Sequence, residues 1–103
     1  MKGENMRLEN KFKTEKLIPR LKEEFEGCMI LHLDPNEVQG IPDLLILHDD
    51  KWAALEAKKS CRESSRPNQH YYVSLMNNMS YSSFVYPENL EEVIYELQQT
   101  FQA

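Results

Sequence analysis

Three charged residues near the middle of the chain have the types that bind a metal ion and activate water: Asp43, Glu56 and Lys58. Two carboxylates held side by side repel each other unless a proton or a cation lies between them, and a divalent cation binds such a pair readily. A neighbouring ammonium group could orient a water molecule or neutralise a phosphate. These residue types predict a hydrolytic metal site, provided that the chain brings the three side chains together.

The segment 40–58 has to bring them together, and its pattern predicts a β-hairpin. Two apolar stretches flank Asp49–Asp50, and a two-residue turn there pairs positions at equal distances from the turn. Asp43 then lies opposite Glu56 at about 5 Å. Lys58 follows Glu56 by two residues and therefore shares its face of the strand. The register predicts one cluster.

A structural salt bridge between Lys58 and Glu56 at the edge of a sheet is the alternative interpretation. The rest of the hairpin is apolar on both faces, which is typical of strands that are covered on both sides. Charged groups are rarely buried at the end of such a hairpin unless they have a function. We therefore favour the metal site.

The same residues resemble a known motif. Pro42-Asp43, a spacer and Glu56-Ala57-Lys58 match the signature of the PD-(D/E)XK nuclease superfamily, and Gly40-Ile41-Pro42-Asp43-Leu44 with a downstream Gln is similar to its small phage-type branch of VRR-NUC domains and Holliday junction resolvases. The resemblance covers most of the chain, from about Glu9 to the last helix. It implies an α/β, restriction-endonuclease-like α-β-β-β-α-β core with a mixed four-stranded sheet flanked by helices, here followed by a C-terminal helix.

The resemblance also implies roles for single residues. Asp43 and Glu56 would hold Mg²⁺, for which Mn²⁺ could substitute, and the carbonyl of Ala57 would be a further ligand. Lys58 would orient or help to deprotonate the attacking water and would neutralise the phosphate in the transition state. These assignments are expectations from the family.

Two further site residues come from helices in such relatives. Gln69 matches the Gln that follows the Glu-x-Lys motif and would orient the nucleophile or the phosphate. Many relatives use a glutamate from the first helix at the metal, and Glu9 and Glu15 are both candidates here. The position of Glu9 before Phe12, together with the resemblance, favours Glu9.

The order of predicted elements agrees with this core. Residues from about 8 to 26 form a helical run in which Pro19 predicts either a kink or a second helix that begins with Pro19 in its first turn. Leu8 and Phe12 fall on a different face from the later apolar positions of this run. A strand over 28–33, the hairpin, a helix over 67–79, a strand over 82–86 and a final helix follow.

Side-chain patterns give expectations for the last two helices. The packing set of the 67–79 helix is expected to be Tyr72, Val73, Leu75, Met76 and Met79. Asn89 and Glu92 are spaced as a capping box for the final helix. The apolar stripe of that helix is expected to lie in the core, and it comprises Leu90, Val93, Ile94, Leu97 and Phe101.

The net charge of −5 argues against nucleic acid until its distribution is considered. Residues 1–22 carry seven Lys or Arg and three Glu, a net charge of +4, and residues 51–70 carry five against two, a net charge of +3. Residues 23–50 hold eight acids and no Lys or Arg. Two basic segments therefore flank the acidic one, and the expected DNA contacts are Lys59, Arg62, Arg66 and Gln39.

Length and composition give expectations for the number of domains, the oligomeric state and the location of the protein. A chain of 103 residues is expected to form a single domain over 1–103, and one so small gains stability from a partner, so we expect a homodimer. The two cysteines lack CxxC spacing, and no apolar run approaches membrane-spanning length. We expect an intracellular protein without membrane contact, in the cytoplasm, including that of a phage-infected host.

The function that these patterns favour is Mg²⁺-dependent endonucleolytic cleavage of DNA, selective for Holliday junctions or other branched DNA. A site-specific enzyme of restriction or homing type and a general DNA nuclease are the alternatives within the same chemistry. A catalytically silent DNA-binding or assembly protein on a nuclease fold is the alternative from another class.

Overall fold

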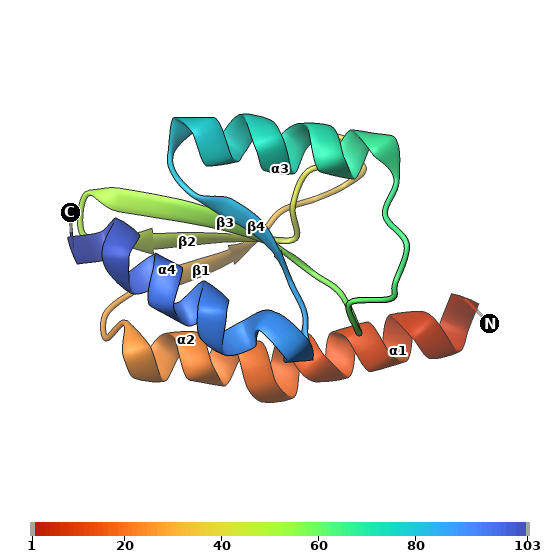
Figure 1. Ribbon diagram of the computed structural model, residues 1–103, viewed down its shortest axis with the longest axis horizontal. Coiled ribbons are helices and arrows are strands. Elements are labelled where there is room, and N and C mark those ends of the chain that lie inside the picture. Colours follow the sequence, from red (N-terminus) through yellow and green to blue (C-terminus); the bar gives the residue numbers. More distant parts are fainter. Residues whose placement is uncertain (1, 103) are drawn as a thin grey trace.

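A computed structural model describes residues 2–102 and the side chains of residues 7–102, and it contains one mixed sheet packed between helices (Figure 1). The strand order is β1-β2-β3-β4, with β1-β2 and β2-β3 antiparallel and β3-β4 parallel. The predicted α/β class, the mixed four-stranded sheet and the C-terminal helix are confirmed. In chain order the elements are α1 (Lys2–Phe12), the π-helical turn η1 (Lys13–Leu17), α2 (Ile18–Glu24), β1 (Met29–His32), β2 (Leu44–His48), β3 (Lys51–Ala57), α3 (Pro67–Met79), β4 (Ser82–Val85), the 3₁₀ turn η2 (Pro87–Asn89) and α4 (Leu90–Gln102).

The β2-β3 hairpin has the predicted register. Leu44 pairs with Leu55 and His48 pairs with Lys51, so Asp49 and Asp50 form a two-residue turn. Asp49 has a φ of 55°, a left-handed conformation that aspartate tolerates better than most residues and that two-residue hairpin turns require. Because the side-chain period of a strand is two, this register fixes which residues of the hairpin face the core.

The two faces of the sheet are covered by different helices. α1, η1, α2 and α4 lie on one side and α3 lies on the other (Figure 1). The core forms on the first side, where alternate residues of β2 and β3 pack against α4, α1 and α2. The predicted apolar stripe of α4 is in this core, with Val93, Ile94, Leu97 and Phe101 buried and Leu90 partly buried.

The predicted break near Pro19 takes the form of the π turn η1, after which α2 begins with Pro19 in its first turn. The N–H of Ile18 donates to the carbonyl of Lys13, five residues earlier. This wider turn places Phe12 and Leu17 on the same side, and both are buried in one core cluster. The expectation that Phe12 lies on a different face from the later apolar residues was therefore wrong, because it assumed an uninterrupted 3.6-residue period.

Deletion of Thr14, an exposed residue of the π turn, is expected to convert η1 into a regular α-helical turn. The faces on both sides of the turn would keep their directions, so the free energy of unfolding should change by less than about 1 kcal/mol. Deletion of exposed Lys22 in the regular helix α2 is the control. That deletion turns Phe25 away from the core and should cost about 3 kcal/mol. Equal losses in chemical denaturation would contradict the role given to the π turn.

α3 has the predicted bounds but not the predicted packing. Leu75 is 41% and Met79 is 67% exposed, and no residue of α3 is buried. The prediction that Leu75 and Met79 belong to the packing set of this helix was wrong, because α3 contacts mainly β3 and β4 and leaves part of its apolar surface in solvent. Helical periodicity identified the apolar positions but could not show how many of them the sheet covers.

The capping box predicted from Asn89 and Glu92 is also replaced by another arrangement. Asn89 Oδ1 accepts a hydrogen bond from the N–H of Tyr86 at 2.9 Å, and Asn89 Nδ2 donates to the carbonyl of Phe84 at 3.0 Å. Asn89 therefore ends β4 and closes the turn η2 before α4 begins. No helix within residues 2–102 is long and apolar enough to cross a membrane.

Candidate metal centre

Three carboxylates meet at the end of the hairpin opposite its turn. Glu9 of α1, Asp43 just before β2 and Glu56 near the end of β3 each offer an oxygen, and these oxygens lie within 4.8 Å of one another. Asp43 and Glu56 meet because the hairpin register places them opposite each other. Glu9 comes from a segment more than thirty residues earlier, on the helix that packs beneath the sheet.

Asp43 is held by the end of β3, by the residue that follows β1 and by the first helical run. Its carboxylate Oδ2 accepts a hydrogen bond from the N–H of Ala57 at 3.2 Å, and its carbonyl accepts one from the N–H of Leu33 at 2.8 Å. Lys13 Nζ lies 3.8 Å from the same Oδ2. Lys13 follows Glu9 by one helical turn, so any helix that brings Glu9 to the cluster also brings this cation.

Lys58 is buried beside the carboxylates. Its Nζ donates to Gln69 Oε1 at 3.0 Å and to the carbonyl of Ser64 at 3.4 Å. The carboxylate oxygens are further away, at 3.7 Å for Glu63 and 4.0 Å for Glu56. The Lys58–Glu56 salt bridge of the alternative interpretation is thus the longest of these contacts, and the ammonium group is positioned mainly by neutral oxygens.

Gln69, in the first turn of α3, connects the lysine to the carboxylate. Its Nε2 donates to Glu56 Oε2 at 3.2 Å, while its Oε1 accepts from Lys58 and from the N–H of Arg66 at 3.1 Å. Both ends of the amide are therefore fixed. The start of α3 is held in turn by Gly40, whose φ is +93° and which lies so close to Asn68 that a Cβ would be 2.7 Å from it.

Burial and mutual repulsion leave the carboxylates poorly stabilised as anions. Burial, followed by the charge of Asp43, raises the pKa of Glu56 to about 8, against a smaller lowering by Lys58. Burial, then a hydrogen bond with Glu63, then the charges of Glu63 and Asp43 raise the pKa of Glu9 to about 8. A divalent cation between these groups would replace their protons and remove the repulsion.

Sequence reasoning did not identify Glu63 or Lys13 as site residues. Glu63 Oε1 accepts a hydrogen bond from the N–H of Lys59 at 2.7 Å, which turns this carboxylate toward Lys58 and Glu9. It lies in an irregular loop, where no periodic pattern indicates direction. Lys13 could have been found from its spacing to Glu9 once Glu9 was assigned to the cluster.

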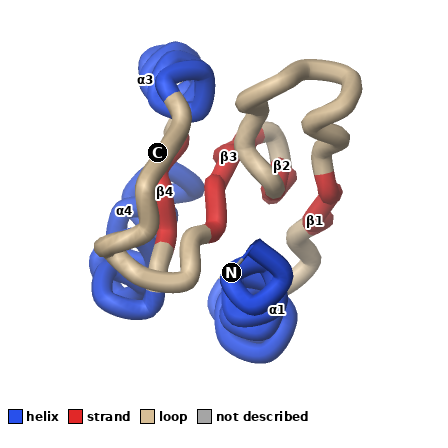
Figure 2. The backbone as a smooth tube through the Cα atoms, turned by 90° about the vertical axis from the view of Figure 1, so that its right-hand side faces the viewer, coloured by secondary structure: helices blue, strands red, loops and turns tan. Residues whose placement is uncertain are grey.

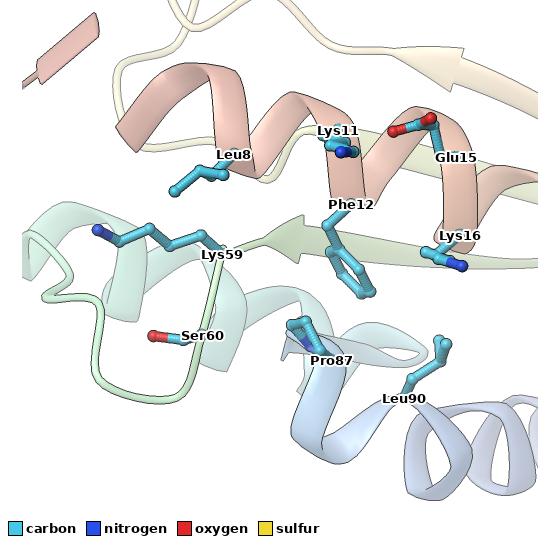
Figure 3. Close-up of a pocket in the computed structure, with 9 residues that line it drawn as sticks. All are labelled: Leu8, Lys11, Phe12, Glu15, Lys16, Lys59, Ser60, Pro87 and Leu90. Atoms are coloured by element: carbon cyan, nitrogen blue, oxygen red, sulfur yellow. The ribbon is translucent and has the colours of Figure 1, made fainter. Parts of the chain in front are cut away.

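The other helix-one candidate, Glu15, is exposed and lies outside the cluster. It lines an apolar cavity of about 690 Å³ between the α1–η1 run and the start of α4. Leu8 and Phe12 also line this cavity, and Lys59 extends along its rim toward Leu8 (Figure 3). None of the three clustered carboxylates lines it, so this cavity is separate from the candidate metal centre.

The remaining predicted DNA contacts lie on two loops. Arg62 and Arg66 are exposed on the loop between β3 and α3, and Gln39 is exposed on the loop between β1 and β2. The loop between β1 and β2 contacts α3 where Gly40 lies against Asn68. Exposed guanidinium groups near the cluster are free to approach a phosphate, but the fold alone assigns them no ligand.

Comparisons of the chain with protein-family models, with curated proteins and with solved structures find no match. Function must therefore be inferred from the chemistry of the site. Three carboxylates from three separate segments form a hard-oxygen donor set that suits Mg²⁺ or Mn²⁺. The absence of His or Cys from this set is unlike a typical zinc site.

Proposed function

We propose that this chain is a metal-dependent endonuclease of the PD-(D/E)XK type, with a restriction-endonuclease-like fold, that hydrolyses phosphodiester bonds in DNA. One observation carries the proposal: the motif residues Asp43, Glu56 and Lys58 converge at one end of a hairpin, with Glu9 and Gln69 completing the cluster. A surface salt bridge would need neither the third carboxylate nor a lysine that is only 5% exposed.

Each side chain has a role in this chemistry. Asp43, Glu56 and Glu9 would hold Mg²⁺ or Mn²⁺, with the carbonyl of Ala57 as an additional predicted ligand. The bound ion would supply charge neutralisation at the phosphate and a more acidic water. The remaining steps depend on neighbouring residues of the chain.

Lys58 is placed to act on the attacking water or on the phosphate. Its Nζ is held by Gln69 and Ser64 at 4.0 Å from Glu56 Oε2, so a water molecule beside Glu56 would also contact the ammonium group. Gln69 keeps both groups in place through its two amide ends. Such fixed dipoles and charges lower a barrier because they need no reorganisation during the reaction.

The first test is nicking of supercoiled plasmid by the purified chain with Mg²⁺ or Mn²⁺, compared with EDTA. Metal-dependent nicking is expected, and its absence with every divalent ion would favour a catalytically silent DNA-binding protein. Cleavage of a synthetic four-way junction against a matched linear duplex then tests selectivity for branched DNA. Equal cleavage of the two substrates would leave a general or site-specific nuclease.

The charge reversals Arg62→Glu and Arg66→Glu are expected to weaken binding to all DNA substrates alike, because contacts to phosphates carry no sequence information. The slope of log K against log salt should flatten by about one unit for each phosphate contact that a substitution removes. Binding is measured in Ca²⁺ to prevent cleavage. Arg20→Glu, on the far part of the helical run and paired with Glu24 and Glu91, is the control, and an equal change in slope there would contradict a specific basic surface.

A further inference from the structure

The sheet is covered unequally on its two faces. Four strands spaced by about 4.8 Å give a sheet roughly 19 Å wide, which has room for about two helices of 10 Å diameter. One face is covered by two such helices, the α1–η1–α2 run and α4. The opposite face carries α3, which lies above the β3–β4 side (Figure 2). Among residues 2–102, no helix lies over β1 and β2 on that face, and the loop between these two strands rises on this side at one end of them (Figure 2).

The side chains beneath this uncovered strip are apolar. Met29 pairs with Leu47, which pairs with Trp52, and Leu31 pairs with Leu45, so the register places all five on one face. Met29 is 57% and Leu31 is 39% exposed, and the other three are half-buried. We call this surface the open face, formed by Met29, Leu31, Leu45, Leu47 and Trp52.

One flank of α3 borders the open face and is also incompletely packed. Asn68 lies against Gly40 on the loop between β1 and β2, and helical spacing turns Tyr72, Met76 and Met79 to the same flank as Asn68. Met79 is 67% exposed. The thirteen residues of α3 include no Asp, Glu, Lys or Arg, which is unusual for a helix on the surface of a protein.

We propose that a second copy of this chain docks on the open face, with α3 of each copy over β1 and β2 of the other. The uncovered strip is one helix wide, and the chain itself presents one helix that is short of apolar contacts. A two-fold arrangement covers the open face and the α3 flank of both copies, because in an isologous interface the same contact occurs twice. The inference does not depend on the nuclease assignment.

Charge selects a second copy over DNA as the occupant of this surface. β1, β2 and α3 contain no lysine or arginine to contact phosphates. They contain no Asp or Glu either, so two chains of net charge −5 repel each other least through this face. At the usual rise per residue, α3 is about 20 Å long and β2 is about 17 Å long. The helix and the open face are therefore of similar length.

The test is the molar mass in solution, measured by sedimentation equilibrium over a range of concentrations. The wild-type chain is expected at twice its monomer mass of 12.2 kDa. Met29→Lys and Met79→Glu should each weaken dimerisation at least about ten-fold, because each buries a charge in an apolar interface. Tyr95→Glu is the matched control, since Tyr95 is 61% exposed but lies on α4 in the opposite layer, and it should remain dimeric.

Mixing the two charged variants tests the arrangement itself. In a two-fold interface a Met29→Lys chain and a Met79→Glu chain form one Lys–Glu contact and one unchanged contact, so the mixture should dimerise more tightly than either variant alone. Circular dichroism of each variant verifies the fold. A monomeric wild-type chain at all concentrations, dissociation by Tyr95→Glu, or no gain on mixing folded variants would overturn the proposal.

Discussion

Glu56→Gln is expected to lower the rate of Mg²⁺-dependent DNA cleavage by on the order of 10³-fold or more while the chain stays folded. The substitution removes the carboxylate that meets both Asp43 and Glu9, but its amide keeps the size of the side chain and still accepts a hydrogen bond from Gln69. Lys58→Met should cause a loss of similar size, because it removes the ammonium group and leaves an apolar chain in the same space. The measurement is single-turnover cleavage at saturating Mg²⁺.

The first helical run provides a matched control pair for this experiment. Glu9 lies in the cluster and Glu15 is exposed outside it, so Glu9→Gln should impair cleavage and Glu15→Gln should not. The two substitutions are chemically identical and only six residues apart. Full activity of Glu56→Gln or Lys58→Met, or equal losses from Glu9→Gln and Glu15→Gln, would show that the cluster is not the active site.

In metal-free buffer the chain is expected to become less stable as the pH rises from about 5 to about 8. The pKa values of Glu9 and Glu56 are raised from 4.5 to about 8 in the folded chain, so between these values the folded state binds more protons than the unfolded state. The contribution of these two carboxyl groups to the free energy of unfolding is complete below their pKa in the unfolded chain. It is lost as the pH rises through their pKa in the folded chain. We expect a loss of about 2 kcal/mol, or roughly 10 °C in the melting temperature.

Mg²⁺ should reverse this loss. At pH 8 the carboxylates are available as ligands, and a cation that binds only the folded chain raises its stability. Glu56→Gln should flatten the metal-free pH profile and reduce the stabilisation by Mg²⁺, and Glu15→Gln should change neither. Thermal unfolding with EDTA or Mg²⁺ across this pH range measures both effects. A metal-free stability that rises toward pH 8 would contradict the buried, protonated carboxylates.

The part of the site within the hairpin could be predicted from the sequence because its geometry is local. Once Asp49 and Asp50 form the turn, the period of two fixes Asp43 opposite Glu56. Glu9 could not be chosen over Glu15 by the same reasoning. The π turn breaks the helical period between them, and its position depends on how Phe12 and Leu17 share one core.

The loop after β3 and the cover of the sheet were beyond prediction for a different reason. Glu63 is directed toward the cluster by a hydrogen bond that its carboxylate accepts from the backbone N–H of Lys59. This contact lies in an irregular segment whose sequence has no periodic pattern. Leu75 and Met79 have the spacing of core residues, yet they are exposed because α3 covers only part of the sheet. Periodicity identifies the apolar side chains of a helix, whereas the layers above and below a sheet decide which of them are buried.

Binding of Mn²⁺ in the absence of DNA, followed by electron paramagnetic resonance of the free ion, tests the central claim most directly. At pH 8 the wild-type chain is expected to remove Mn²⁺ from the free pool, Mg²⁺ should compete, and Glu56→Gln should bind far less than Glu15→Gln. If wild type and Glu56→Gln bind Mn²⁺ equally, or if the wild-type chain binds none at millimolar concentrations, then Glu9, Asp43 and Glu56 do not form a metal centre.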